Sequence, residues 1–178
     1  MPFLLFISGA SGAGKTAVVE HLQVSSSQRH LALLNFDSMG IPTNEEMIAQ
    51  AGSLERWAEK ATHAWMEKIA REYKDHPVVI LEGQANPDFV RAGCAKNRLT
   101  DFALVLLDCD WECRSQRLIQ RRQSELANPH MKNWSDFLRN QARQQGIKII
   151  DTTTRTVKQV ADEILALAPP DKRSGEIV

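Results

Sequence analysis

The amino-acid sequence predicts an α/β protein in which a parallel sheet of about five strands is covered by helices on both faces. Short apolar runs of the buried-strand type alternate with amphipathic helical patterns along the 178 residues. In addition, the first apolar run passes into a glycine-rich loop that leads directly into a helix. Strands that alternate with helices form parallel sheets, because each return crossing needs a connecting segment. We expect one domain over residues 1–168 and a loose C-terminal tail over 169–178.

The first expected strand, residues 3–7, continues into a loop with the pattern G-x-x-x-x-G-K-T. Small residues let backbone N–H groups turn inward around phosphate oxygens, and the helix that follows directs its positive end at the same anion. The lysine of this pattern contacts the β and γ phosphates, and the threonine hydroxyl binds Mg²⁺. The pattern therefore predicts a site for nucleotide phosphates and Mg²⁺. Its residues are Gly9, Ala10, Ser11, Gly12, Ala13, Gly14, Lys15 and Thr16.

The other expected strands are also short runs rich in Val, Ile and Leu, as is typical of strands buried on both faces. They cover residues 31–36, 78–81, 102–107 and 147–150. Asp37, Glu82 and Asp108 stand at or just after the ends of the first three of these runs. In open α/β folds ligands bind at the carboxyl ends of the strands, so these positions belong to the predicted ligand edge.

Capping signals define several of the expected helices. Thr43 and Glu46 form a capping box that opens a helix to about residue 51. Asn86-Pro87 opens a helix to about residue 94, and Asp110 caps one over 111–123. The remaining expected segments are a polar turn at 25–28, helices at 54–73 and 134–145, a short excursion at 124–133, and a last helix to 167 that is capped by Thr154 or Thr156.

Composition excludes several kinds of partner. Lys and Arg number 22 and Asp and Glu also number 22, so no overall field attracts nucleic acid or a membrane surface. The three cysteines contain no C-x-x-C pair, which argues against a disulfide framework and a structural zinc site. The apolar N-terminus is too short for a signal peptide. We expect a cytoplasmic monomer or homodimer with neither nucleic-acid nor membrane partners.

In element order and motifs, the chain resembles the small P-loop kinases, the group that includes nucleoside monophosphate kinases, shikimate kinase and gluconate kinase. The resemblance covers nearly the full length and is most specific in the phosphate loop. It implies a three-layer P-loop NTPase fold with a short lid at about 124–133, and it implies ATP and Mg²⁺ as cofactors with a small-molecule phosphoryl acceptor.

Two arginines on the expected 111–123 helix match the adenylate kinase pattern. In that pattern one arginine packs on the adenine, and another four residues later reaches the phosphates from the start of a mobile lid. The resemblance gives these roles to Arg117 and Arg121, and four-residue spacing places both on one helix face. A solvated basic face is the alternative. Arg139 and Arg143 repeat the spacing on the next helix and could reach the transferring phosphoryl group when the lid closes.

Asp37 points to the reaction class. In the shikimate and gluconate kinase patterns an aspartate just past the second strand faces the acceptor hydroxyl, as an orienting base or through Mg²⁺, and the resemblance gives this role to Asp37 with Ser38. Glu82 could hold a Mg²⁺-bound water. Alternatively, Glu82 or Gln84 could bind acceptor hydroxyls. Arg56 and Arg91 are candidates for binding the phosphate of an acceptor nucleotide.

The resulting hypothesis is an ATP-dependent phosphotransferase that acts on a hydroxyl of a sugar, sugar acid, nucleoside or similar molecule. A nucleoside monophosphate kinase is the second reading. The third is a non-catalytic or nucleotide-switched module, because Asp37 to Gly40 spells the D-x-x-G of a GTPase switch. No N-K-x-D guanine signature accompanies it, and the glycine triplet of shikimate kinase is replaced by Glu82-Gly83-Gln84.

Overall fold

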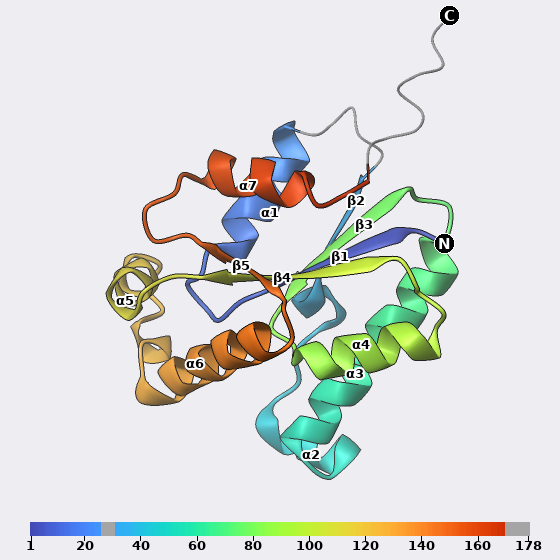
Figure 1. The fold of residues 1–178 in the computed structure, drawn as a ribbon. Helices are drawn as coiled ribbons and strands as arrows, with labels where there is room; N and C mark the ends of the chain where they lie inside the picture. Colours follow the sequence, from blue (N-terminus) through green and yellow to red (C-terminus); the bar gives the residue numbers. More distant parts are fainter. Residues whose placement is uncertain (26–30, 170–178) are drawn as a thin grey trace, which may run out of the picture.

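The structure is a computed structural model that describes residues 1–25 and 31–169. It confirms the predicted five-stranded parallel sheet, with strand order β2-β3-β1-β4-β5 (Figure 1). The strands are β1 Phe3–Ser8, β2 Leu31–Asn35, β3 Val78–Gly83, β4 Phe102–Asp108 and β5 Lys148–Asp151. Apart from their first residues, the turn predicted at 25–28 and the tail predicted at 169–178 lie outside the described residues.

Helices cover both faces of this sheet, so the predicted three-layer fold is confirmed. Helices α1 and α7 pack together on one face, while α3, α4 and α6 cover the other (Figure 1). The helices are α1 Lys15–Ser25, α2 Asn44–Ala51, α3 Leu54–Glu72, α4 Pro87–Lys96, α5 Trp111–Gln120, α6 Pro129–Gln144 and α7 Val157–Leu165, with short 3₁₀ turns η1 Phe36–Met39 and η2 Ser124–Leu126.

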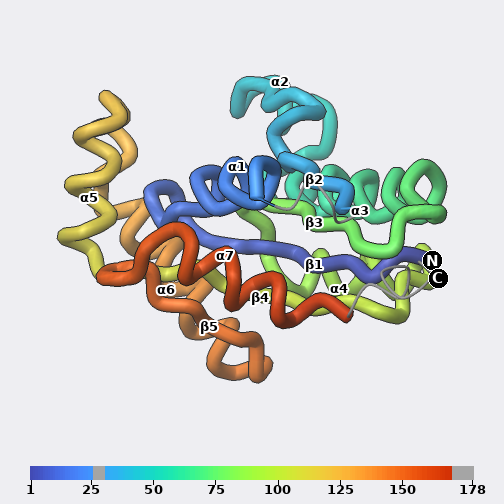
Figure 2. Tube along the Cα trace, turned by 90° about the horizontal axis from the view of Figure 1, so that it is seen from above, coloured from blue at the N-terminus to red at the C-terminus, as the bar shows by residue number. Residues whose placement is uncertain are grey.

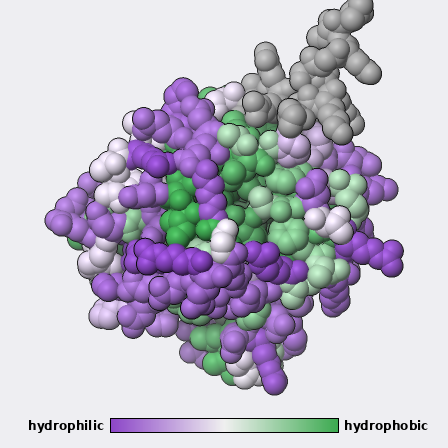
Figure 3. Space-filling view, in the orientation of Figure 1, coloured by the Kyte–Doolittle hydropathy of each residue, from purple (hydrophilic) through white to green (hydrophobic). Residues whose placement is uncertain are grey.

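The central strand β1 lies between β3 and β4 and is buried on both faces, as its continuous apolar sequence predicts. Leu5 and Ile7 point to the core under α1 and α7, while Leu4 and Phe6 point to the core under α3 and α4. Figure 3 shows the outer surface in the same orientation as Figure 1, with apolar residues gathered near the middle of the view and hydrophilic residues around them. The sheet is therefore a rigid base for the loops at its carboxyl edge.

Most of the predicted helix starts are confirmed. Thr43 forms both hydrogen bonds of its capping box, Asn86 and Asp110 accept from backbone N–H groups of the first turns they precede, and Thr156, not Thr154, caps α7. The expected helix end at residue 123 was wrong, because α5 ends at Gln120.

The predicted start of the helix after the excursion was also wrong. Helix α6 begins at Pro129 and not at residue 134, because Asn128 Oδ1 accepts from Met131 N at 2.9 Å and proline occupies the first helical position. The irregular segment before α6 is therefore shorter than the expected lid. It begins at Arg122, whose φ of 58° is in the left-handed region.

The carboxyl ends of the strands meet at one end of the molecule. Figure 2 shows α5 at this end and the N-terminus at the opposite end. The loop between β1 and α1 opens at the same edge as η1, the end of β3 and the start of α5. Within the described residues, no helix is both long and apolar enough to span a membrane.

Candidate active site

The loop Gly9–Thr16 joins β1 to α1 and has the backbone conformation that its sequence requires. Gly12 and Gly14 have φ angles of +85° and +98°, which side-chain-bearing residues rarely adopt. Helix α1 begins at Lys15, so its first N–H groups have no partner within the helix and face the loop. A loop of this shape at a helix N-terminus can bind an anion through backbone N–H groups.

The Lys15 side chain is buried within this loop, with only 9% of its surface exposed. Its Nζ donates to Gly9 O at 2.9 Å and to Ala10 O at 3.5 Å. Burial lowers the pKa of the Lys15 ammonium, Glu82 and Asp37 act against this shift, and Arg121 adds to it. Three of the residues predicted from sequence are therefore near enough to affect the charge of Lys15.

Glu82 stands in the last part of β3, next to the phosphate loop, and is 3% exposed. Its Oε1 accepts from Thr16 Oγ1 at 3.5 Å and from Asn35 Nδ2 at 2.5 Å. Burial is the main cause of a raised pKa at this carboxyl, and the nearby Lys15 charge opposes the shift. Thr16 and Glu82, predicted to act at one metal site, thus lie within contact of each other.

Asp37 lies in η1, directly after β2, and its side chain is exposed. The Asp37 backbone N–H donates to Asn35 Oδ1 at 2.7 Å, and Ser38 Oγ donates to Asn35 O at 2.7 Å. Asn35 therefore holds both the turn that carries Asp37 and the carboxylate of Glu82. Sequence reasoning missed Asn35, although its place at the carboxyl end of a parallel strand was a usable signal.

A second contact links β3 to the phosphate loop. Gln84, which follows β3, donates from Nε2 to Ser11 Oγ at 2.9 Å. Gln84 is exposed at this edge, so the structure places it beside the loop on the same side as Glu82.

Arg117 on α5 crosses to the end of β5. Its Nη2 donates to Thr152 O at 2.6 Å and its Nη1 to Thr152 Oγ1 at 3.0 Å, while Thr152 Oγ1 donates to Ala13 O at 3.0 Å. Arg117 also lies 3.5 Å from Gly12 O. Thr152, which sequence reasoning missed, thereby ties α5, β5 and the phosphate loop together.

Arg117 and Arg121 line the same cavity of about 210 Å³, which confirms that their spacing places them on one side of α5. The cavity adjoins Gly14 of the phosphate loop and has an apolar wall formed by Val18 and Val160. A planar guanidinium opposite an apolar wall can hold a flat ring. Arg121 is exposed at the C-cap of α5.

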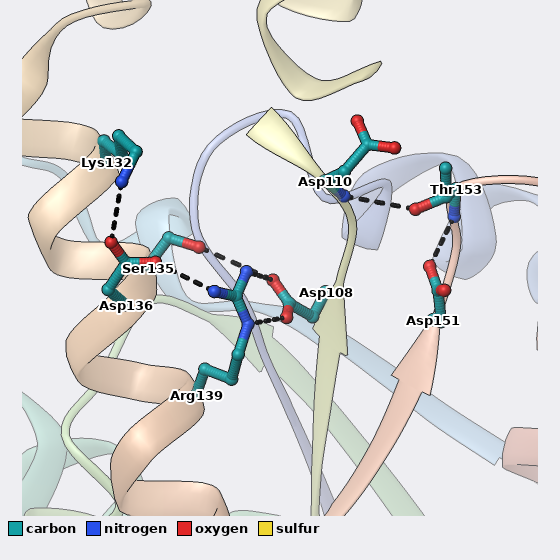
Figure 4. A network of polar contacts seen from close by, with 8 residues as sticks. All are labelled: Asp108, Asp110, Lys132, Ser135, Asp136, Arg139, Asp151 and Thr153. Carbon is teal, nitrogen blue, oxygen red and sulfur yellow. Dashed lines mark hydrogen bonds and ion pairs between the residues drawn. The ribbon is translucent and has the colours of Figure 1, made fainter. Parts of the chain in front are cut away.

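The structure does not bring the other predicted substrate arginines to the loop. Arg139 on α6 forms an ion pair with Asp108, with an Nε to Oδ2 distance of 2.5 Å, and a second pair with Asp136 at 2.8 Å (Figure 4). Arg91 donates to Gln145 at 3.1 Å across the contact between α4 and α6. Arg56 is exposed in the first turn of α3, beside Gly52. Spacing had placed Arg139 on a helix face but had not given its partners.

No protein-family model matches the chain, and no curated protein sequence matches it. Solved structures do. A gluconokinase from Sinorhizobium meliloti 1021 is similar over 94% of this chain and 93% of its own, with a TM-score of 0.64 and 16% identity. A sugar kinase from Janibacter sp. HTCC2649 covers 94% of both chains, with a TM-score of 0.62 and 14% identity.

A third structure, shikimate kinase from Acinetobacter baumannii in complex with shikimate, is similar over 100% of this chain and 97% of its own. The TM-score is 0.56 and the identity 17%. At identities this low the likeness concerns the fold. Over its described residues, the chain has the three-layer fold of these small kinases.

Proposed function

We propose that this protein is an ATP-dependent phosphotransferase that transfers the γ-phosphoryl group of ATP to a hydroxyl of a small molecule. One observation carries the proposal: Lys15 is buried in the phosphate loop, Glu82 accepts from Thr16 of the same loop, and Asn35 joins Glu82 to the turn that carries Asp37. A phosphate loop with carboxylates beside it, which can hold Mg²⁺ or position a hydroxyl, is what phosphoryl transfer to a hydroxyl needs.

The residues of the loop fit a nucleoside triphosphate with Mg²⁺. Lys15 Nζ donates to loop carbonyls, so it is already held at the place where phosphate oxygens would compete for it. Thr16 and Glu82 lie together beside the loop, where they would hold the ion directly or through water. Bound Mg²⁺ would neutralise charge that develops on the phosphates during transfer.

Asp37 would orient the acceptor hydroxyl and take its proton. The side chain is exposed at the carboxyl edge while its turn is held by Asn35, so it can meet a ligand without losing its position. Phosphoryl transfer passes through a loose transition state, so such a base mainly positions the nucleophile. Gln84, which donates to Ser11, would bind a further hydroxyl of the acceptor.

Arg121 would stabilise the phosphoryl group in transit, and Arg117 would pack on the adenine. Both roles suit the 210 Å³ cavity that the two arginines share with Gly14, because it lies between the phosphate loop and the apolar wall of α1 and α7. Arg117 uses the edge of its guanidinium to bind Thr152, which leaves a face for stacking.

A hydroxyl acceptor is favoured over a nucleoside monophosphate. An acceptor phosphate needs cations near the ends of β2 and β3. The two arginines predicted as candidates for this role, Arg56 and Arg91, make other contacts. Arg91 is hydrogen-bonded to Gln145 in the contact between α4 and α6, and Arg56 is exposed beside Gly52.

A screen of acceptors with ATP and Mg²⁺ tests the proposal. Nucleosides, nucleoside monophosphates, sugars, sugar acids and small antibiotics are incubated with the protein and with its Lys15→Ala variant as the matched control. We expect ADP and one phosphorylated product in equal amounts, formed only by the wild-type protein. Product from a nucleoside monophosphate alone would replace the proposal by the second reading. ATP binding without any transfer would favour a non-catalytic nucleotide-binding module.

A further inference from the structure

A second polar cavity lies on the α6 side of the sheet and has a volume of about 670 Å³. It is bounded by the start of α5, by α6 and by the ends of β4 and β5. None of the phosphate-loop residues 9–16 is among its described lining residues. Pockets of this size hold small organic ligands. The cavity is therefore separate from the site of the proposed phosphoryl transfer.

Arg114 on α5 lines this cavity and is only 2% exposed. Its Nε and Nη1 are fully enclosed and have no hydrogen-bond partner among the described residues. The guanidinium lies 5.1 Å from the centre of the Trp111 ring. Burial lowers the pKa of this guanidinium, yet arginine stays charged in proteins. A buried charge without hydrogen-bond partners is costly, so Arg114 is a donor that lacks its acceptor.

The carboxylates on α6 and β4 are not that acceptor, because they are already engaged. Asp108 accepts from Arg139 Nε at 2.5 Å and Nη2 at 3.2 Å, and Asp136 binds Lys132 at 3.1 Å and Arg139 at 2.8 Å (Figure 4). Two cations and two carboxylates thus neutralise one another along one wall. None of the four forms a hydrogen bond with Arg114 in the described structure.

The two remaining carboxylates are used by the backbone. Asp110 Oδ1 accepts from Cys113 N at 2.7 Å, and Asp151 Oδ1 accepts from Thr153 N at 2.8 Å. Among the lining cations, Arg143 forms no ion pair with a described residue and is exposed. The lining holds as many carboxylates as cations, and the two cations that form no ion pair with a described residue are Arg114 and Arg143.

We propose that this cavity is a second ligand site, which binds the oxyanion group of a small molecule, a phosphate or a carboxylate, between Arg114 and Arg143. Planar guanidinium groups bind both kinds of oxyanion through paired N–H donors. A single phosphate or carboxylate group fills only part of the cavity, so the remaining volume can hold the rest of the ligand. Because Nε and Nη1 of Arg114 are enclosed, binding would require a small shift of the guanidinium, after which the ligand would supply the acceptor that the described residues do not.

The test needs a variant that removes the charge and keeps the packing. A Cβ atom at Gly12 would lie 2.6 Å from Arg114 Cγ, so the stem of Arg114 supports the phosphate loop. Arg114→Met keeps such a stem. Arg143→Gln changes an exposed position, so it should fold even if the buried variant does not. Lys96→Gln, at an exposed cation on α4 outside the lining, is the control.

All variants are made in a Lys15→Ala background, so that the phosphate loop does not mask the second site, and are titrated calorimetrically with inorganic phosphate and with citrate. We expect binding of at least one anion, a rise of about tenfold or more in its Kd for Arg114→Met and Arg143→Gln, and no change for Lys96→Gln. Binding by phosphate or by citrate tells which oxyanion the site takes.

Two results would overturn the inference. One is that neither anion binds to the Lys15→Ala protein, and the other is that affinity is unchanged in Arg143→Gln and in a folded Arg114→Met protein. Cooperative melting of each variant establishes that it is folded. The inference does not depend on the proposed phosphoryl transfer, so a failed acceptor screen leaves it standing.

Discussion

Asn35 on β2 and Glu82 on β3 are register partners in the sheet, and a 2.5 Å hydrogen bond from Asn35 Nδ2 to Glu82 Oε1 joins their side chains. The other atom of the same amide, Oδ1, accepts from Asp37 N. One side chain therefore orients both acidic residues of the proposed active site. These two contacts fix which atom of the Asn35 amide is the nitrogen and which is the oxygen, because only the nitrogen can donate to a carboxylate.

Loss of this amide should weaken metal use. We expect Asn35→Ala to lower the rate with an identified acceptor by about 10- to 100-fold and to raise the Mg²⁺ concentration needed for half-maximal rate, as happens when partners of metal-binding groups are removed. Initial rates measured against Mg²⁺ concentration check this. Asn97→Ala, which removes a similar amide from the end of α4, is the control. An unchanged Mg²⁺ dependence in Asn35→Ala would contradict the role.

Glu82 should make stability depend on pH. Its pKa in the folded protein is raised above the ordinary value of 4.5, mainly by burial. The folded state thus holds the proton more tightly than the unfolded chain. The stabilisation that the Glu82 carboxyl gives to the folded state is fully present below pH 4.5, and it is lost as the pH rises through the raised pKa of the folded protein.

We therefore expect Glu82→Gln to melt at a higher temperature than the wild type at pH 8, and to lose this advantage at pH 4. Melting temperatures are measured without nucleotide or Mg²⁺, because either would bind near the carboxylate. Glu67→Gln changes an exposed carboxylate on α3 and should show little of this pH dependence. A Glu82→Gln protein that is less stable than the wild type at pH 8 would speak against the buried-carboxylate argument.

Nucleotide binding should depend on Lys15. Ligand that binds only the native state stabilises it by mass action, and at a hundredfold excess over Kd the melting temperature of a protein this size rises by about 5–10 °C. We expect this shift with ATP and Mg²⁺ in the wild type and its near absence in Lys15→Ala. Differential scanning fluorimetry over a range of ATP concentrations measures it. An equal shift in both proteins would place the nucleotide elsewhere.

Asp37 and Arg121 should affect transfer in different ways. We expect Asp37→Asn to keep ATP affinity and lower kcat, because it removes proton acceptance at the nucleophile and leaves the phosphate loop alone. Arg121→Ala should lower kcat by more, since arginines that stabilise the transferring group contribute about 10³ to 10⁵ in rate. Steady-state kinetics with an identified acceptor compare the two. If Asp37→Asn keeps the wild-type kcat and only raises the KM for ATP, Asp37 has a metal or structural role instead.

Local sequence patterns were enough to predict the sheet, the phosphate loop and most helix starts. Each of these is encoded within a few neighbouring residues, such as the glycines at positive φ or the Thr43 capping box. The start of α6 was predicted wrongly because its first turn, with His130 and Lys132, has no apolar periodicity. The prediction followed this periodicity and gave too little weight to the cap signal at Asn128.

Partners distant in sequence could not be predicted in the same way. Spacing placed Arg139 on a helix face, but its pairing with Asp108, 31 residues away, depends on how α6 packs against β4. Thr152 is 139 residues from Ala13, to which it donates. Such contacts depend on strand order, and no short segment of the sequence encodes strand order.

The ion pair between Asp108 and Arg139 also limits which segments can cover the carboxyl edge of the sheet. It fastens α6 to the end of β4, so the N-terminal half of that helix cannot swing over the phosphate loop while the pair stays intact. This ion pair does not hold the chain between Arg121 and the Asn128 cap, which contains the left-handed Arg122. Even fully extended, these few residues span only about 25 Å. We propose that this short segment is the lid, which would cover a phosphoryl group and a compact acceptor and would leave a bulky acceptor partly outside.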